Sequence, residues 1–197
     1  MYVDIKQAYH FTQLDRTNTT NIPYINYITE TKLFKFKCKD KRVYHVTLEV
    51  YRSKVAFIKF FPLKQITNPN KFKIRTGKQP DFNRILATCV KLAEKEIRKR
   101  PDLIYAFFGQ WDDKDVISKR VVSQRFNLYT YLATTYFVKE SYHHVNYPDI
   151  NLYFLLDKEH FNFNNSKEVK EFLYNKIMPD LPREAISSLV IPEHDQL

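Results

Sequence analysis

Residues 82–109 read FNRILATCVKLAEKEIRKRPDLIYAFFG and set the order of secondary structure in this chain. Apolar side chains recur at intervals of three and four in the first part, at Phe82, Ile85, Leu86, Cys89, Leu92, Ala93 and Ile97. This spacing predicts a helix with one buried face, which Asp81 begins and Pro101 ends. Residues 103–108 are apolar without interruption and stop at Gly109, which is typical of a strand covered on both faces.

The segments on either side show two different periods. Period-two alternation predicts strands over residues 32–39, 42–51 and 54–62, and a further short strand over 71–75. On the C-terminal side, period 3.6 predicts a helix over residues 123–136. A closing pair of strands follows over 137–145 and 151–157, and Ser166 is expected to cap a third helix.

This order predicts the fold class. A helix that connects two strands of one sheet requires a right-handed crossover and parallel strands. We therefore expect an α/β fold of the α+β type, with a mixed, mostly antiparallel sheet, a central parallel pair and helices on both faces. The 197 residues suit one domain. Residues 1–31 should be irregular, residues 32–157 should form the core, and residues 158–197 should form a C-terminal helix and tail.

Composition excludes several classes of protein. With 44% hydrophobic residues, the chain is not disordered by default. Its two glycines, Gly77 and Gly109, cannot form a Gly-rich phosphate loop of the P-loop or Rossmann kind. We find no signal peptide and no apolar run long enough to span a membrane. Cys38 and Cys89 lack a CxxC spacing, so we expect reduced thiols in the cytoplasm.

The net charge of +10 suits anionic partners, including nucleic acid. Residues 32–42 interleave basic residues with Leu33, Phe34 and Phe36, as single-strand binders do. The same alternation is also typical of a half-buried edge strand protected by lysines. His143 and His144 are adjacent, so on a strand they point to opposite faces and cannot chelate one metal ion together.

Residues 71–137 resemble the C-terminal half of the GCN5-related N-acetyltransferase fold. In that family a strand leads into a pyrophosphate-binding loop and helix, a central strand then separates from its neighbour, and the next helix carries an Asn/Arg-x-x-Leu-Tyr signature. The matching pieces here are residues 72–75, the helix from Phe82, residues 103–108, and Arg125-Phe-Asn-Leu-Tyr129.

The chain is also similar to degenerate acetyltransferase-like proteins of phage genomes. The matching residues are Thr76-Gly77, Cys89-Val90, Ala106-Phe107-Phe108 and Ser123-Gln-Arg-Phe-Asn-Leu-Tyr129.

The resemblance implies two functional elements. The first is an anion site for the coenzyme pyrophosphate, formed by Thr76, Gly77 and Lys78 and assisted by Asn127. The second is Tyr129 as the proton donor to the departing thiolate. Tyr129 also lies on the apolar face of its expected helix, where a tyrosine can serve the core instead.

One departure from the family decides the functional prediction. Pro80 and Asp81 stand where the family has free donors and glycines, and they disfavour phosphate. We therefore predict an acetyltransferase-like protein without efficient catalysis or a bound cofactor, which acts through a protein partner in a phage or mobile-element context. The alternatives are an active N-acyltransferase that uses acetyl-coenzyme A and a basic nucleic-acid-binding module. The sequence sets no oligomeric state.

Overall fold

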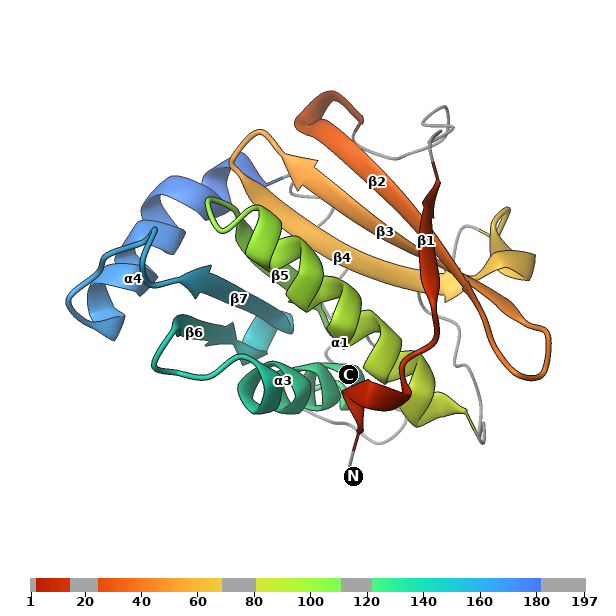
Figure 1. The fold of residues 1–197 in the computed structure, drawn as a ribbon. Coiled ribbons are helices and arrows are strands. Elements are labelled where there is room, and N and C mark those ends of the chain that lie inside the picture. The colour runs from red at the N-terminus through yellow and green to blue at the C-terminus, as the bar shows by residue number, and fades with distance from the viewer. Residues whose placement is uncertain (1–2, 15–24, 69–80, 111–121, 182–197) are drawn as a thin grey trace, which may run out of the picture.

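The computed structural model describes residues 3–14, 25–68, 81–110 and 122–181. In this part of the chain, seven strands form one sheet in the order β1-β2-β3-β4-β5-β7-β6 (Figure 1). The strands are β1 (Phe11–Leu14), β2 (Ile28–Lys37), β3 (Val43–Tyr51), β4 (Val55–Pro62), β5 (Ile104–Phe108), β6 (Tyr142–Tyr147) and β7 (Leu152–Asp157). The α-helices are α1 (Phe82–Lys99), α3 (Gln124–Tyr136) and α4 (Ser166–Phe172).

Short helical turns complete the described elements. They are the 3-10 turns η1 (Ile5–Gln7), η2 (Ile25–Tyr27), η3 (Leu63–Gln65), η4 (Pro148–Ile150) and η6 (Met178–Asp180), and the π-helical turn η5 (Leu173–Ile177) that continues α4.

The strand pairing confirms the predicted fold class. β4 and β5 are parallel, and the other neighbouring pairs are antiparallel. α1 connects β4 to β5, which is the crossover that a parallel pair requires.

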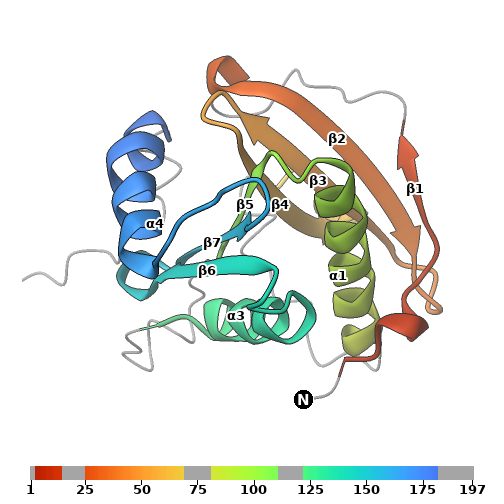
Figure 2. The same cartoon turned by 60° about the vertical axis from the view of Figure 1, so that its left-hand side comes forward.

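Alternating side chains place helices on both faces of the sheet, as predicted. From β3, Tyr44, Val46 and Leu48 join a core with α1 and α3. Residues on the opposite face of the central strands, among them Phe57 and Ile104, pack with α4 and η5. Figure 2 shows α1 and α3 on one side of the sheet and α4 on the other.

Four details differ from the sequence predictions. The segment expected to be irregular contains β1, whose residues pair with β2. The first closing strand begins at Tyr142, because Phe137 is still the C-cap of α3. Asn165, and not Ser166, caps α4, since its side chain accepts hydrogen bonds from the N–H groups of Lys167 and Glu168.

The fourth difference concerns the neighbour of the central strand. The short strand expected over residues 71–75 comes directly before α1 in the sequence, but β5 lies between β4 and β7. Residues 71–75 lie outside the described residues, and the parallel neighbour of β5 is β4, earlier in the chain.

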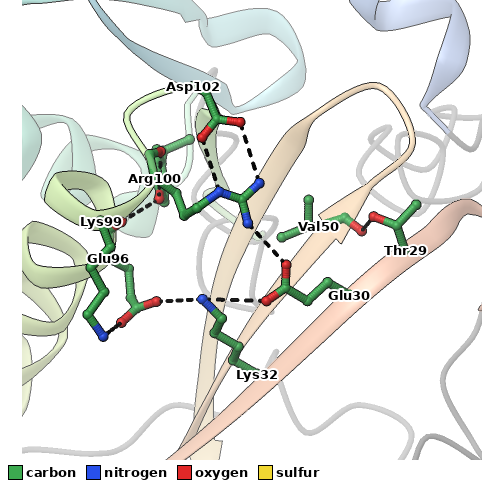
Figure 3. A network of polar contacts seen from close by, with 9 residues as sticks. Thr29, Glu30, Lys32, Val50, Glu96, Lys99, Arg100 and Asp102 are labelled. Atoms are coloured by element: carbon green, nitrogen blue, oxygen red, sulfur yellow. Dashed lines mark hydrogen bonds and ion pairs between the residues drawn. The ribbon is translucent and has the colours of Figure 1, made fainter.

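A charge network fastens the C-terminal end of α1 to β2 (Figure 3). It consists of Glu30, Lys32, Glu96, Lys99, Arg100 and Asp102. The carboxylate of Glu96 is 1% exposed and lies 3.0 Å from the ammonium of Lys32. Arg100 reaches both Glu30 and Asp102. The basic run at the end of α1 thus has carboxylate partners as well as the favourable helix dipole.

Candidate functional site

The parallel strands β4 and β5 separate soon after they pair. Their register contains three residue pairs, Val55 with Ile104, Ala56 with Tyr105, and Phe57 with Ala106. Beyond Phe57, β4 stays paired with β3 to Pro62. Phe107 and Phe108 of β5 stay paired with β7. Each strand therefore keeps its antiparallel neighbour while β4 and β5 stop pairing with each other. We call the place where their pairing ends, together with the cavity beside it, the cleft.

A cavity of about 110 Å³ lies at this divergence, on the face that α1 and α3 cover. Its lining residues come from β4, β5, β7, α1 and α3. They are Ile58, Phe60, Leu86, Cys89, Val90, Ala93, Ile97, Tyr105, Ala106, Phe107, Tyr129, Leu132, Ala133, Phe137 and Leu155. The lining side chains are apolar except for two phenol hydroxyls and one thiol. An apolar cavity of this kind suits an apolar ligand and does not hold water well.

Tyr129 is the predicted site residue that the structure places at the cleft. Its ring meets Phe107 of β5 edge-on, with 5.5 Å between centroids, and lies 6.2 Å from the ring of Phe60 on β4. It therefore bridges the two separated strands. The side chain is half-buried, and we find no hydrogen bond to its hydroxyl among the described residues.

The environment of Tyr129 fixes its protonation state. Burial raises the pKa of its hydroxyl to about 12, and the nearby Arg125 opposes this only partly. The hydroxyl is therefore protonated at neutral pH and can donate a hydrogen bond or a proton. The other phenol of the cavity, Tyr105, already donates to the carbonyl of Glu96 at 2.8 Å.

The thiol in the cavity wall is not a nucleophile at neutral pH. Burial raises the pKa of Cys89 to about 12, whereas only a thiolate attacks efficiently. Burial also raises the pKa of Cys38, to about 11. Both cysteines are free, which confirms the prediction of unpaired thiols.

Of the predicted coenzyme-binding residues, the structure describes Asn127 alone. Thr76, Gly77 and Lys78 lie outside the described residues. Asn127 is exposed on α3, two positions before Tyr129. Residues two apart on a helix do not share a face, so the structure does not bring Asn127 to the cavity with Tyr129.

A buried polar cluster holds the end of β5 beside the start of α3. The Ser123 hydroxyl donates to the carbonyl of Gly109 at 2.6 Å and accepts the N–H of Phe126 at 3.0 Å. The side-chain oxygen of Asn151 accepts the N–H of Ser123 at 2.8 Å. A side chain at Gly109 would collide with Phe126, since its Cβ would lie 2.3 Å from that of Phe126.

Sequence reasoning did not identify this cluster as a unit. Ser123 was readable as the start of a helix, but its partner Asn151 is 28 residues away. The one signal in the local sequence is the residue type at position 151. Asparagine adopts a left-handed backbone more readily than most residues, and Asn151 has a φ of 49°.

An N-terminal segment, residues 3–9, packs against the two helices that line the cavity. Val3 packs with Leu86, Val90 and Leu132, three residues that also line the cavity. Its carbonyl accepts a hydrogen bond from the hydroxyl of Tyr136 on α3. The segment is also anchored on α1, where the Thr88 hydroxyl oxygen accepts the N–H of Tyr9 at 2.8 Å.

The basic segment of residues 32–42 does not expose its phenylalanine rings for stacking on bases. Phe34 and Phe36 are 1% and 2% exposed, inside the core under α1. Lys35 and Lys37 point the other way and are exposed. The arrangement is that of a half-buried strand, and only its lysines are accessible to phosphates.

The two adjacent histidines contact different groups. His143 lies 3.0 Å from the carbonyl of Phe161, and His144 lies 2.5 Å from the hydroxyl of Tyr153. Over the described ranges, no group of three or more His, Cys, Asp or Glu side chains is arranged to hold a metal ion.

The chain matches no protein-family model, no curated protein and no solved structure. None of the helices in the described part of the chain has the length and apolar character needed to cross a membrane.

Proposed function

We propose that this protein has an acetyltransferase-like architecture and binds the acyl group of a coenzyme A thioester where β4 and β5 separate. The observation that carries the proposal is the loss of pairing beyond Phe57 and Ala106, directly beside an apolar cavity. A central strand that separates from its neighbour is the feature that the resemblance led us to expect. The cavity favours thioester binding over the prediction that the chain has no cofactor.

The residues around the cavity fit an acyl group. An acyl chain is apolar and needs no hydrogen-bond partners along its length, which suits the cavity walls. The Tyr129 hydroxyl is the one polar donor of the cavity not engaged elsewhere in the described structure. It can serve the carbonyl oxygen or the sulfur of a thioester.

Slow turnover follows from the same residues. In acyl transfer to an amine, the carbon–nitrogen bond forms and the carbon–sulfur bond breaks. The thiolate gains a proton and the nitrogen loses one. Tyr129 can supply the first proton and recover the second. However, no carboxylate or imidazole lines the described cavity to assist proton removal, and Cys89 is protonated. We therefore propose binding with inefficient catalysis.

The test is calorimetric titration of the full chain with acetyl- and butyryl-coenzyme A, with coenzyme A as the reference. We expect binding of at least one acyl form. We also expect Tyr129→Phe to weaken it several-fold, since one hydrogen bond contributes about 0.5–1.5 kcal/mol. A thiol-release assay with amine acceptors should give slow turnover. If no thioester binds at millimolar concentration, the proposal is wrong.

Cellular context belongs to the same proposal. We place the protein in the cytoplasm, on the basis of its two free cysteines. A protein partner and a phage or mobile-element setting stay predictions from the resemblance.

A further inference from the structure

The volume of the cavity carries information about the size of its occupant. A cavity of about 150 Å³ lined by aliphatic and aromatic side chains holds one benzene molecule, which has six carbon atoms. By proportion, 110 Å³ accommodates about four to five carbon atoms. A single methyl group would leave most of this space empty, and a long chain would extend beyond it.

Small side chains on both helices leave room for this volume. Ala93 of α1 and Ala133 of α3 both line the cavity with small side chains. A larger residue at either position would fill the space, so these alanines keep it open. Val3 packs on Leu86 and Leu132, which are part of the cavity lining. The volume of about 110 Å³ therefore depends on these packed walls and on the two alanines.

We propose that the cavity selects a short aliphatic group of about four to five carbon atoms in preference to acetyl. As part of a thioester ligand, this inference rests on the proposed function. The same apolar group can also arrive as a free small molecule. The two sources share their chemistry, and the experiment separates them.

The first arm measures chain-length dependence. The full chain is titrated with acetyl-, butyryl-, pentanoyl- and decanoyl-coenzyme A. Each buried methylene improves affinity about fourfold, so butyryl-coenzyme A should bind about fifteenfold more tightly than acetyl-coenzyme A. The gain should stop beyond pentanoyl, and decanoyl-coenzyme A should bind no better than butyryl-coenzyme A. Equal affinity for all chains would overturn the inference but leave the proposed function standing.

The second arm uses xenon, an apolar probe without coenzyme A, and follows cavity occupancy by NMR. We expect chemical-shift changes at Cys89, Ala93 and Ala133. If xenon binds there and no thioester binds, the cavity is a site for free apolar molecules and the proposed function is wrong. If neither ligand perturbs these residues, the site itself is disproved.

Two variants locate the effect. Ala133→Leu adds three carbon atoms inside the cavity and should abolish the preference for butyryl over acetyl. Thr134→Leu makes a comparable change at an exposed position of the same helix and should keep the preference. The melting temperature of each variant checks folding. If Ala133→Leu does not fold, Ala93→Leu provides the same test from α1.

Discussion

Side chains pack differently on the two faces of the sheet at the place where β4 and β5 stop pairing. On the α4 face, Phe57 of β4 stacks directly on Phe108 of β5, with 4.8 Å between centroids and 6° between planes. On the α1 and α3 face, Phe60 and Phe107 occupy the corresponding strands, and Tyr129 lies against both rings. The first face is closed by direct contact between the strands. The second is bridged from a helix, and the cavity lies there.

This difference separates a closely packed core from a core that also contains a cavity. The α4 face buries Leu152, Phe154, Leu156 and Leu173 completely. Such close packing is costly to disturb. On the other face, the residues that border the cavity have fewer neighbouring atoms on that side. Truncation of such a residue therefore removes fewer contacts. Matched substitutions on the two faces can test this comparison.

The largest effect is expected for two phenylalanines of β4, Phe57 and Phe60, which lie on opposite faces of the sheet. Phe57→Ala should lower the free energy of unfolding by about 3–5 kcal/mol, because it removes a buried ring. Phe60→Ala should cost about 1–3 kcal/mol, since its half-buried ring borders a cavity. Denaturant unfolding measures both losses, and equal m-values show that the variants expose the same surface on unfolding. Equal losses would contradict the distinction between the two faces.

The charge network should affect stability without affecting the cleft. Lys32→Met removes a partner of the buried Glu96, although Lys99 remains near, so we expect a loss of about 1–3 kcal/mol. Arg98→Met breaks an exposed ion pair with Glu94 and should cost less than about 0.5 kcal/mol. Both variants should bind thioesters as the unsubstituted chain does. A change of binding in Lys32→Met would connect the network to the site.

The two phenol hydroxyls of the cavity should differ in how much they contribute to the free energy of unfolding. Tyr105→Phe removes hydrogen bonds to the carbonyls of Glu96 and Arg100 and should cost about 1–1.5 kcal/mol of stability. Tyr129→Phe should change stability by less than about 0.5 kcal/mol, because we find no partner for its hydroxyl in the described structure. Thermal unfolding compares the two. A large destabilisation by Tyr129→Phe would assign its hydroxyl to the core and not to the cleft.

The smallest effect concerns pH and the β6–β7 side of the sheet. Burial lowers the pKa of His144 below its ordinary value of 6.5, so the unfolded chain binds its proton more readily. The stability that neutral His144 contributes is therefore present above about pH 6.5 and is lost as the pH falls from there through the lowered pKa.

Urea unfolding at pH 7 and pH 5 should show this loss. The difference in the free energy of unfolding between pH 7 and pH 5 should be smaller in His144→Gln than in the unsubstituted chain. Protonation of the ring would also remove its ability to accept the hydroxyl of Tyr153. An unchanged difference between the two pH values in His144→Gln would exclude this histidine as the cause.

The sequence determined most local elements of this protein. The periodic apolar positions of residues 82–97 predicted α1, and the uninterrupted run before Gly109 predicted β5, because periodicity reports one buried face directly. The resemblance also assigned a functional role to Tyr129, which stays a prediction. Its position at the cleft follows from α3 lying beside β5.

Only the tertiary structure decided which strand stands next to β5 and what lies between them. The partner of β5 is about fifty residues earlier in the chain, and no local pattern distinguishes it from other apolar strands. The cavity depends on where β4 and β5 stop pairing and on two alanines, Ala93 and Ala133, brought together from different helices. A volume left by packing is a property of contacts between distant residues, and a single sequence does not specify those contacts.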